Sequence, residues 1–340
     1  MIKYPSNIKK RDTIGVTATS AGITGDYEIR FNRAQHNLEA LGYKIKETKN
    51  VRKYAKLVSS SGKERANEFL DLWKNDNISL IAQVTGGEFL MEMIPYIDKS
   101  IILEHKPKWI TGYSDSSLLN YYITTNFNIA TSTSPNFMNF GMINLHDSLL
   151  KHLEILENGK KFVQESYKLY EKEKWPKDVI EFPSYNLSDE VLYKSLYGEK
   201  SLSFEGRLIG GCIDVIYHLL GSPFDNTKSF CEQFKEDGML WYLENCELPL
   251  PALYRVLWQM KQGGWFNNAN GFIIGRTKSS DSVQDFEYLD VLHKIFDDMN
   301  VPVVYDVDFG HQPPQWTMIN GSFAKFEYNE GKGKIEQHLK

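Results

Sequence analysis

The feature that most constrains the fold is the alternation of short β-rich runs with helical stripes through the first 130 residues. Apolar residues recur at helical spacing from Phe31 to Leu41, and Gly42 stands where a helix commonly ends. Runs typical of buried strands flank this stripe and the next one, over Thr13–Thr19, Tyr43–Glu47 and Ser79–Val84. Alternation at this spacing predicts βαβ units, an α/β fold and a mostly parallel sheet.

Composition narrows the class of protein further. The chain has 340 residues, which suggests two domains or one large one, and its content of 41% hydrophobic and 13% aromatic residues argues against disorder. No run approaches 18 uncharged apolar residues, which predicts no membrane span, and the polar start predicts no secretory signal. A net charge of −5 without a basic block argues against nucleic acid as a partner.

The three cysteines indicate a reducing compartment. Cys212, Cys231 and Cys246 are an odd number and contain no CxxC pair, so neither a disulfide framework nor a zinc ribbon is expected. We therefore expect a cytoplasmic protein.

Changes in composition divide the chain into three parts. We predict an N-terminal α/β domain over residues 1–163, a connector over 164–203 and a smaller C-terminal α/β domain over 204–340. The connector is rich in Lys, Glu, Tyr and Ser and has little periodicity. The C-terminal domain restarts with a strand at Phe204, and Trp316–Gln337 is expected to form a β-hairpin.

Two expectations about local structure concern segments near candidate functional residues. A helix is expected over Glu88–Ile97, directly after the Gly86-Gly87 turn. A second glycine turn is expected at Gly210-Gly211, followed by an apolar helix that ends near Leu220. Neither turn matches a nucleotide-binding glycine pattern, so no nucleotide cofactor is predicted.

Three predicted strand ends hold residues of types that catalysis can use: Ser114, Glu244 and His311. Ligands of α/β sheets gather at the carboxyl ends of strands. Ser114 follows a strand and a glycine and precedes a helix, an arrangement that resembles a nucleophile elbow. The alternative is that Ser114 or Asp115 serves as a helix N-cap.

Glu244 and His311 complete a Ser-His-Glu set. A carboxylate that ends the apolar strand Met239–Leu243 is costly unless it is exposed or paired, and His311 would be a suitable partner. The alternatives are a surface loop for His311 and a solvent-facing strand end for Glu244, with Glu247 just beyond it as a competing candidate. In a triad the serine attacks a carbonyl, the histidine moves the proton and the carboxylate orients the ring.

The oxyanion of such a reaction needs two N–H donors, which the backbone of Gly87 and Asp115 could supply. Metal catalysis needs clustered ligands, and neither an HExxH nor an HxH motif occurs in the chain. We therefore predict no metal and no cofactor.

Several segments resemble the LD-carboxypeptidase family of serine peptidases, which includes the microcin C self-immunity peptidases. The matching segments are DTIGVTATSAG (12–22), QVTGGEF (83–89), GYSDSSLL (112–119), EGRLIGGCID (205–214), LWYLENCE (240–247), Gly275-Arg276 and DFGHQPPQWTMINGS (308–322). They follow family order over nearly the whole chain. The resemblance assigns the nucleophile to Ser114, the acid to Glu244, the base to His311 and the oxyanion donors to Gly87 and Asp115.

The resemblance also implies a fold and an activity. The family fold is a flavodoxin-like or amidotransferase-like parallel-sheet N-terminal domain with a smaller α/β C-terminal domain, and its members are commonly homodimers. The implied activity is metal-independent cleavage of an L,D-peptide bond in murein-derived peptides during peptidoglycan recycling. The alternatives are an immunity-type peptidase that cleaves aminoacyl-nucleotide conjugates and a catalytically silent member that binds a ligand.

A short substrate with a free carboxylate would need a cation or amide in the cleft. Within the matching segments the candidates are Arg207, Arg276, Gln315 and Asn320, and salt bridges or turn contacts explain them equally well. Trp175 and Tyr185 of the connector could stack on an adenine, although packing is the favoured interpretation. The expected partner is a small peptide or peptide-nucleotide conjugate.

Overall fold

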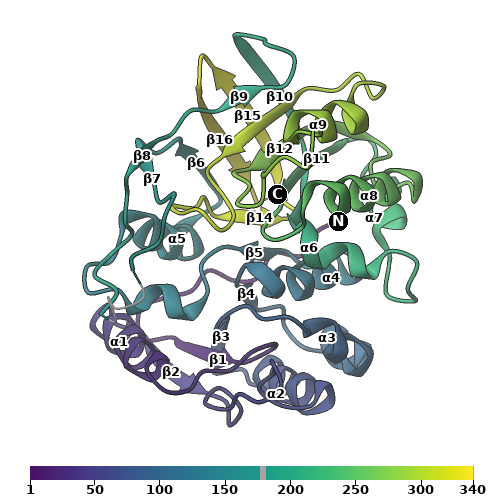
Figure 1. Ribbon diagram of the computed structural model, residues 1–340. Coiled ribbons are helices and arrows are strands. Elements are labelled where there is room, and N and C mark those ends of the chain that lie inside the picture. The colour runs from purple at the N-terminus through teal and green to yellow at the C-terminus, as the bar shows by residue number, and fades with distance from the viewer. Residues whose placement is uncertain (177–180, 340) are drawn as a thin grey trace.

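The computed structural model describes residues 1–176 and 181–339, in which two large sheets are separated by a layer of helices (Figure 1). The first sheet has the strand order β14-β5-β4-β3-β1-β2, and β1 to β5 run parallel. Its strands are β1 (Thr13–Thr17), β2 (Lys44–Glu47), β3 (Ile78–Gln83), β4 (Trp109–Thr111), β5 (Thr131–Thr133) and β14 (Met318–Asn320). The predicted parallel α/β sheet is thereby confirmed.

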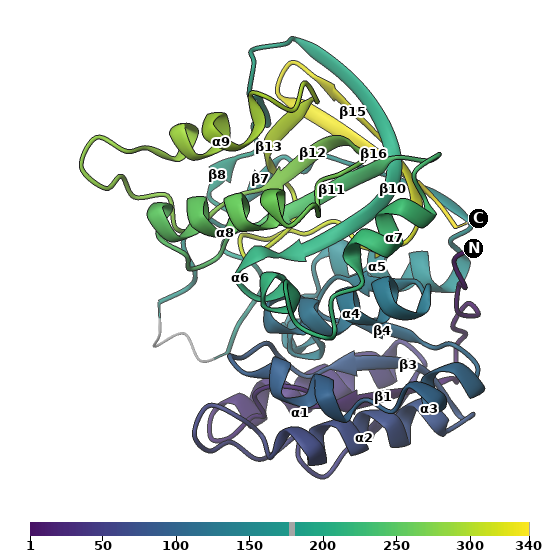
Figure 2. The ribbon, with the colours of Figure 1, turned by 90° about the vertical axis from the view of Figure 1, so that its right-hand side faces the viewer.

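Five helices belong to the first sheet. They are α1 (Tyr27–Ala40), α2 (Gly62–Lys74), α3 (Lys99–Glu104), α4 (Ser117–Phe127) and α5 (Asp147–Asn158). A capping box between Ser61 and Glu64 starts α2, whose apolar stripe faces the sheet. Figure 2 shows α4 and α5 between the two sheets, with α2 and α3 beyond the first sheet. Because α4 packs on both halves, nearly all of its side chains are buried.

The second sheet has the order β6-β16-β15-β10-β11-β12-β13-β9, with a parallel centre from β10 to β13. Its strands are β6 (Lys161–Glu165), β9 (Lys194–Ser195), β10 (Ser201–Cys212), β11 (Met239–Glu244), β12 (Ala269–Gly275), β13 (Val303–Val307), β15 (Phe323–Asn329) and β16 (Lys332–His338). Strands β7 (Leu169–Tyr170) and β8 (Asp189–Glu190) form a separate pair. Helices α6 (Ile213–Ile216), α7 (Thr227–Gln233), α8 (Leu250–Gln262) and α9 (Tyr288–Phe296) accompany this sheet.

Two strands join the sheet of the opposite half. Strand β14 comes from the C-terminal part of the sequence but pairs antiparallel with β5 of the first sheet. Strand β6 follows α5 and pairs with β16 in the second sheet. The halves are therefore linked by main-chain hydrogen bonds as well as by the packing of α4. Residues 177–180 of the predicted connector and residue 340 lie outside the described residues.

Two predictions of local structure are corrected. The helix expected over Glu88–Ile97 is a 3₁₀ segment, Leu90–Tyr96, which contains Pro95 and so lacks a backbone donor inside the helix. Gly210 and Gly211 lie within β10 instead of in a turn, and their φ angles of +157° and +150° are open to glycine. The helix after them is short, α6 followed by the 3₁₀ turn Tyr217–Leu219.

The predicted hairpin is formed by β15 and β16, whereas β14 leaves it for the other sheet. No helix within the described ranges is long and apolar enough to cross a membrane.

Candidate active site

Ser114 lies on a sharp turn between β4 and α4. Its φ of +66° is in the left-handed region, which a serine adopts at a strain cost of order 1–3 kcal/mol. The strand ends at Thr111, and a 3₁₀ turn over Ser114–Ser116 leads directly into α4. Strand, strained turn and helix are the context that the nucleophile-elbow interpretation requires.

His311, from the second half of the chain, is hydrogen-bonded to the Ser114 side chain on this turn. Its Nε2 lies 2.9 Å from the Ser114 Oγ, and its Nδ1 lies 2.8 Å and 3.1 Å from the two oxygens of Glu244. The edge of the Tyr113 ring packs against the imidazole, with 5.1 Å between ring centroids. Both ring nitrogens are thus occupied, and the imidazole has one orientation.

Glu244 is the last residue of β11 and is 3% exposed. A buried carboxylate needs a partner, and His311 supplies it from the segment that follows β13. Adding a Cβ to Gly310 would place it 2.6 Å from a Glu244 oxygen, so this carboxylate also lies tightly against the main chain before His311. The structure therefore brings together all three residues that the sequence predicted for a triad.

The Glu244 carboxylate opposes the effect of burial on His311. Burial alone would lower the pKa of His311, but the adjacent Glu244 carboxylate, together with the Cys246 thiol, raises it well above its usual value. A carboxylate in this position stabilises the imidazolium that forms when the ring takes a proton.

The main chain around Ser114 leaves space for a developing oxyanion. A Cβ on Gly86 would lie 2.8 Å from the Ser114 Oγ and 3.6 Å from the Asp115 nitrogen, so glycine keeps this space open. The φ of Gly87 is +153°, and a Cβ there would meet the Ser20 hydroxyl at 2.2 Å. Within residues 1–176 and 181–339, neither the Gly87 nor the Asp115 N–H donates to a carbonyl in a turn or cap.

The side chain of Asp115 has a role that the sequence analysis did not anticipate. This buried carboxylate accepts hydrogen bonds from the Ser20 hydroxyl and from the Leu90 N–H, the latter at 2.9 Å. Burial raises the pKa of Asp115, and these two donors together with Arg65 oppose the shift. Asp115 thereby ties the loop after β1 and the end of the glycine-containing loop at Leu90 to the turn that carries Ser114.

The four residues predicted to contact substrate have partners within the protein. Arg276 pairs with the buried Asp308 and donates to the Gln312 carbonyl at 3.0 Å, while Gln315 donates to the Gly310 carbonyl. These contacts hold the segment that carries His311. These contacts are better explained if Arg276 supports the loop that carries His311 than if its side chain binds a ligand.

Arg207 lies far from Ser114, and Asn320 is hydrogen-bonded to β10 and β11. Arg207 forms an ion pair with Asp237 at the amino end of the parallel strands, five residues before Cys212 and so about 16 Å along β10. Asn320 accepts from the Gly210 N–H at 3.0 Å and from the Tyr242 hydroxyl at 2.9 Å. Arg207 cannot reach Ser114 from this position.

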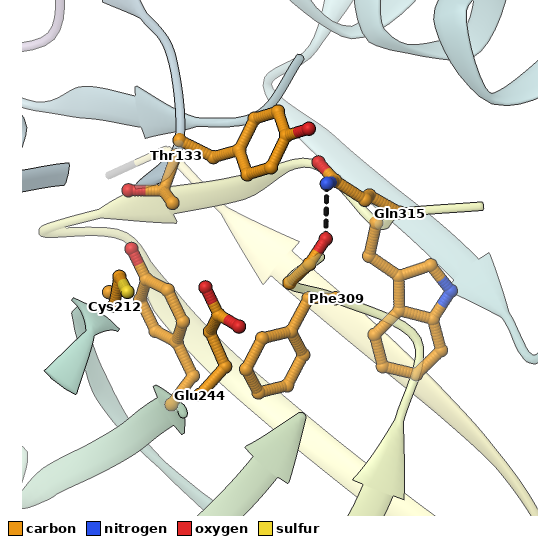
Figure 3. Close-up of a pocket in the computed structure, with 10 residues that line it drawn as sticks. Thr133, Cys212, Glu244, Phe309 and Gln315 are labelled. Atoms are coloured by element: carbon orange, nitrogen blue, oxygen red, sulfur yellow. Dashed lines mark hydrogen bonds between the residues drawn. The ribbon is translucent and has the colours of Figure 1, made fainter. Parts of the chain in front are cut away.

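A small cavity of about 10 Å³ lies beside Glu244 (Figure 3). Thr133, Cys212, Phe309 and Gln315 also line it. The volume is near the minimum for one water molecule, so a substrate has to reach Ser114 from outside this cavity. The sequence analysis did not connect Thr133 or Cys212 with the site, because both depend on strand register between distant segments.

The two connector aromatics have packing partners. Tyr185 is buried and packs against His146, with 5.2 Å between ring centroids. The Trp175 indole donates to the Ser184 carbonyl at 2.7 Å. These contacts agree with the interpretation of both rings as packing residues.

A hydroxyl on a strained turn, a histidine at its side and a buried carboxylate behind it define the class of serine hydrolases on an α/β fold. Comparison with known proteins makes this more specific. Residues 14–134 match the LD-carboxypeptidase N-terminal domain, and residues 205–326 match the LD-carboxypeptidase C-terminal domain. The chain belongs to the LD-carboxypeptidase family and is a serine-type carboxypeptidase.

Relatives along the whole chain agree with this assignment. The Microcin C7 self-immunity protein MccF of Escherichia coli is 27% identical over 96% of this chain and 94% of its own length. The probable murein peptide carboxypeptidase of Bacillus subtilis is 24% identical over 98% of this chain and 94% of its own. The crystal structure of an MccF-like protein from Bacillus anthracis superposes with a TM-score of 0.83 at 22% identity, covering 99% of both chains. This last likeness shows the fold.

Proposed function

We propose that Ser114, His311 and Glu244 are a catalytic triad, and that the enzyme cleaves an L,D-peptide bond next to a terminal D-residue in murein-derived peptides. The observation that carries the proposal is the continuous hydrogen-bonded chain from the Ser114 Oγ through both His311 nitrogens to Glu244. A module that merely binds a ligand has no need of this chain, which argues against the catalytically silent alternative.

The geometry supports a defined sequence of proton transfers. His311 Nε2 accepts the proton of the Ser114 hydroxyl as the oxygen attacks the substrate carbonyl, and it later protonates the leaving amine. Water then attacks the acyl-enzyme with His311 as the base again. Glu244 holds the proton on Nδ1 and stabilises the charged ring throughout.

The tetrahedral intermediate carries its negative charge in the space in front of Gly86. The N–H groups of Gly87 and Asp115 are the proposed donors to this oxygen. Loss of one such donor typically costs about 10²- to 10³-fold in turnover. Every step uses groups of the chain itself, and we propose that no metal takes part.

A substrate carboxylate would need a hydrogen-bond donor close to Ser114. Of the four predicted contacts, Gln315 lines the cavity beside Glu244, whereas Arg207 lies at the far end of β10. We therefore keep Gln315 as the candidate contact, with Arg276 and Asn320 supporting the surrounding main chain.

A second candidate function has its own support. MccF is the most similar relative reported above, and related structures contain MccF with glutamyl sulfamoyl guanosine and with aspartyl sulfamoyl adenosine. The alternative for this chain is cleavage of the amide that joins an aminoacyl group to a nucleotide. The acyl-transfer chemistry would be the same, and the pocket for the leaving group would differ.

One set of assays separates the two substrates. Purified enzyme is incubated with a muropeptide tetrapeptide, with the same peptide amidated at its C-terminus, and with an aspartyl adenylate analogue. We expect release of D-alanine from the free acid, little reaction with the amide, and activity that EDTA leaves unchanged. Equal rates on the acid and the amide would contradict carboxylate recognition, and turnover of the nucleotide conjugate alone would establish the second function.

Two further expectations concern the assembly, from the family resemblance, and the location, from the cysteine content. We propose that the enzyme is a homodimer and is cytoplasmic. Sedimentation velocity at micromolar concentration tests the first, and fractionation of cells expressing the tagged chain tests the second.

A further inference from the structure

Three metal-binding side chains meet at the proposed triad: Cys212, Glu244 and His311. Strands β10 and β11 pair in parallel, and their register places Cys212 directly opposite Glu244. A ligand atom from each of Cys212, Glu244 and His311 lies within 4.8 Å of the others. Figure 3 shows Cys212 and Glu244 beside the same cavity.

A second thiol approaches the same histidine. Cys246 lies two residues after Glu244, and its thiol is near enough to His311 to contribute to the raised pKa of the ring. Asp214 accepts hydrogen bonds from the Cys246 and Glu247 N–H groups, at 3.0 Å and 2.7 Å, and its Oδ2 lies 3.4 Å from the Cys212 Sγ. Asp214 thus holds the two cysteine-bearing segments next to each other at the end of β10.

From these positions we propose that Cys212, Glu244 and His311, with Cys246 as the fourth ligand, bind one Zn²⁺ ion that switches the enzyme off. Sulfur, nitrogen and carboxylate oxygen are the ligand types that Zn²⁺ takes. Tetrahedral Zn²⁺ places its ligand atoms roughly 3.3–3.8 Å apart, so the side chains need to close by about 1 Å. The proposal goes beyond the peptidase reaction, which needs no metal.

Binding and catalysis exclude each other because they use the same atoms. Zn–S bonds replace the S–H bonds of Cys212 and Cys246, and the His311 nitrogen that faces Glu244 gives up its proton before it binds the ion. These protons go to solvent, and no electron is transferred. His311 donates a ring lone pair to the ion, and Glu244 donates a carboxylate oxygen. With a ring nitrogen bound to the ion, the imidazole can no longer act as the base for Ser114. Without a metal, His311 is already hydrogen-bonded to both Ser114 and Glu244. The fold therefore does not require Zn²⁺, and the ion would act as an inhibitor.

The first test measures binding without reference to activity. Metal-free protein is titrated with Zn²⁺ in competition with a chromophoric chelator, using wild type and the variants C212S, C246S and C231S. Cys231 lies in α7, where its Sγ contacts the Trp265 carbonyl, so C231S is the matched control. We expect one Zn²⁺ per chain, a loss of affinity of at least about 10-fold in C212S and a smaller loss in C246S, with C231S unchanged.

Two further measurements identify the ligands and the consequence. Co²⁺ in place of Zn²⁺ should give a thiolate charge-transfer band that C212S loses, and Mg²⁺, which has little affinity for thiolates, should not compete. Zn²⁺ should inhibit the wild type with the same midpoint as binding, and EDTA should reverse the inhibition. Absence of stoichiometric binding, or equal affinity in wild type and C212S, would overturn the proposal. S114A, which lacks the proposed nucleophile, should bind Zn²⁺ with the same affinity as wild type. Zinc binding can therefore be tested even if the peptidase assignment is wrong.

Discussion

At the scale of single residues, Ser114 combines a strained main-chain conformation with a hydrogen bond between its hydroxyl and His311. Its positive φ points the hydroxyl away from the sheet and toward His311, 197 residues further along the chain. Such strain persists where the surrounding structure holds the residue in place, and here a buried α4 behind it and His311 in front do so. The orientation of this hydroxyl therefore depends on contacts that a single substitution can remove.

Replacing Ser114 with alanine removes the proposed nucleophile. We expect turnover to fall at least about 10⁴-fold, because triad members act as a unit. The melting temperature and the circular dichroism spectrum should stay close to wild type, since α4 and β4 are untouched. A variant that retains more than a tenth of the activity would show that Ser114 is not the nucleophile.

Replacing Glu244 with glutamine tests the partner of His311. The carboxylate raises the pKa of this histidine against the lowering effect of burial, so its removal should lower that pKa. The acid limb of kcat/KM should then move to lower pH, while the maximal rate falls by about 10⁴-fold through loss of the correct tautomer. An unchanged acid limb in E244Q would mean that another group controls it.

At the scale of elements, the site is formed by segments that follow parallel strands. The loop after β3, the turn after β4, the end of β11 and the segment after β13 all lie at carboxyl ends. Asp115 and the Arg276–Asp308 pair fix two of these segments by buried, charge-assisted hydrogen bonds. These contacts hold the loops in defined positions at the ends of the strands.

A methyl group on Gly86 should disturb this arrangement locally. In G86A the new Cβ would lie 2.8 Å from the Ser114 Oγ, which displaces the hydroxyl and fills the oxyanion space. We expect turnover to fall at least about 10²-fold with the fold retained. G25A is the control, because a Cβ there meets nothing within 4 Å although the φ is +61°. Equal activities of the two variants would contradict the placement of the oxyanion.

At the scale of the whole molecule, a buried histidine lies where the two halves meet. His152 of α5 is completely buried between Thr111 of β4 and Thr317, the residue before β14, with 3.3 Å to each hydroxyl. Burial lowers the pKa of His152 to about 3. The folded protein therefore holds this ring neutral, while the unfolded chain binds a proton below the ordinary histidine pKa.

The sign of the resulting pH dependence follows from linkage. The unfolded state binds more protons below about pH 6.5, so this contribution to stability is lost as pH falls, at about 1.4 kcal/mol per pH unit down to about pH 3. Urea midpoints at pH 7.5 and 5.0 should differ less in H152Q than in wild type, because glutamine does not titrate. The same difference in both proteins would show that His152 does not contribute to acid sensitivity.

The sequence by itself determined the parallel α/β sheet and the three residues of the proposed triad. Both are local signals: apolar periodicity predicts strands and helices, and the residue types at strand ends show where chemistry can occur. The 3₁₀ segment at Leu90–Tyr96 was missed although its cause, Pro95, is also local, since the apolar pattern was given more weight than the missing donor.

The tertiary structure alone decided which side chains are free to act. Arg207 and Arg276 look alike as sequence candidates, but one is paired at the far end of β10 and the other supports the loop of His311. Cys212 becomes a neighbour of Glu244 through the register of β10 and β11, and β14 crosses into the first sheet. Such pairings depend on contacts between distant segments, whose energies no local pattern encodes.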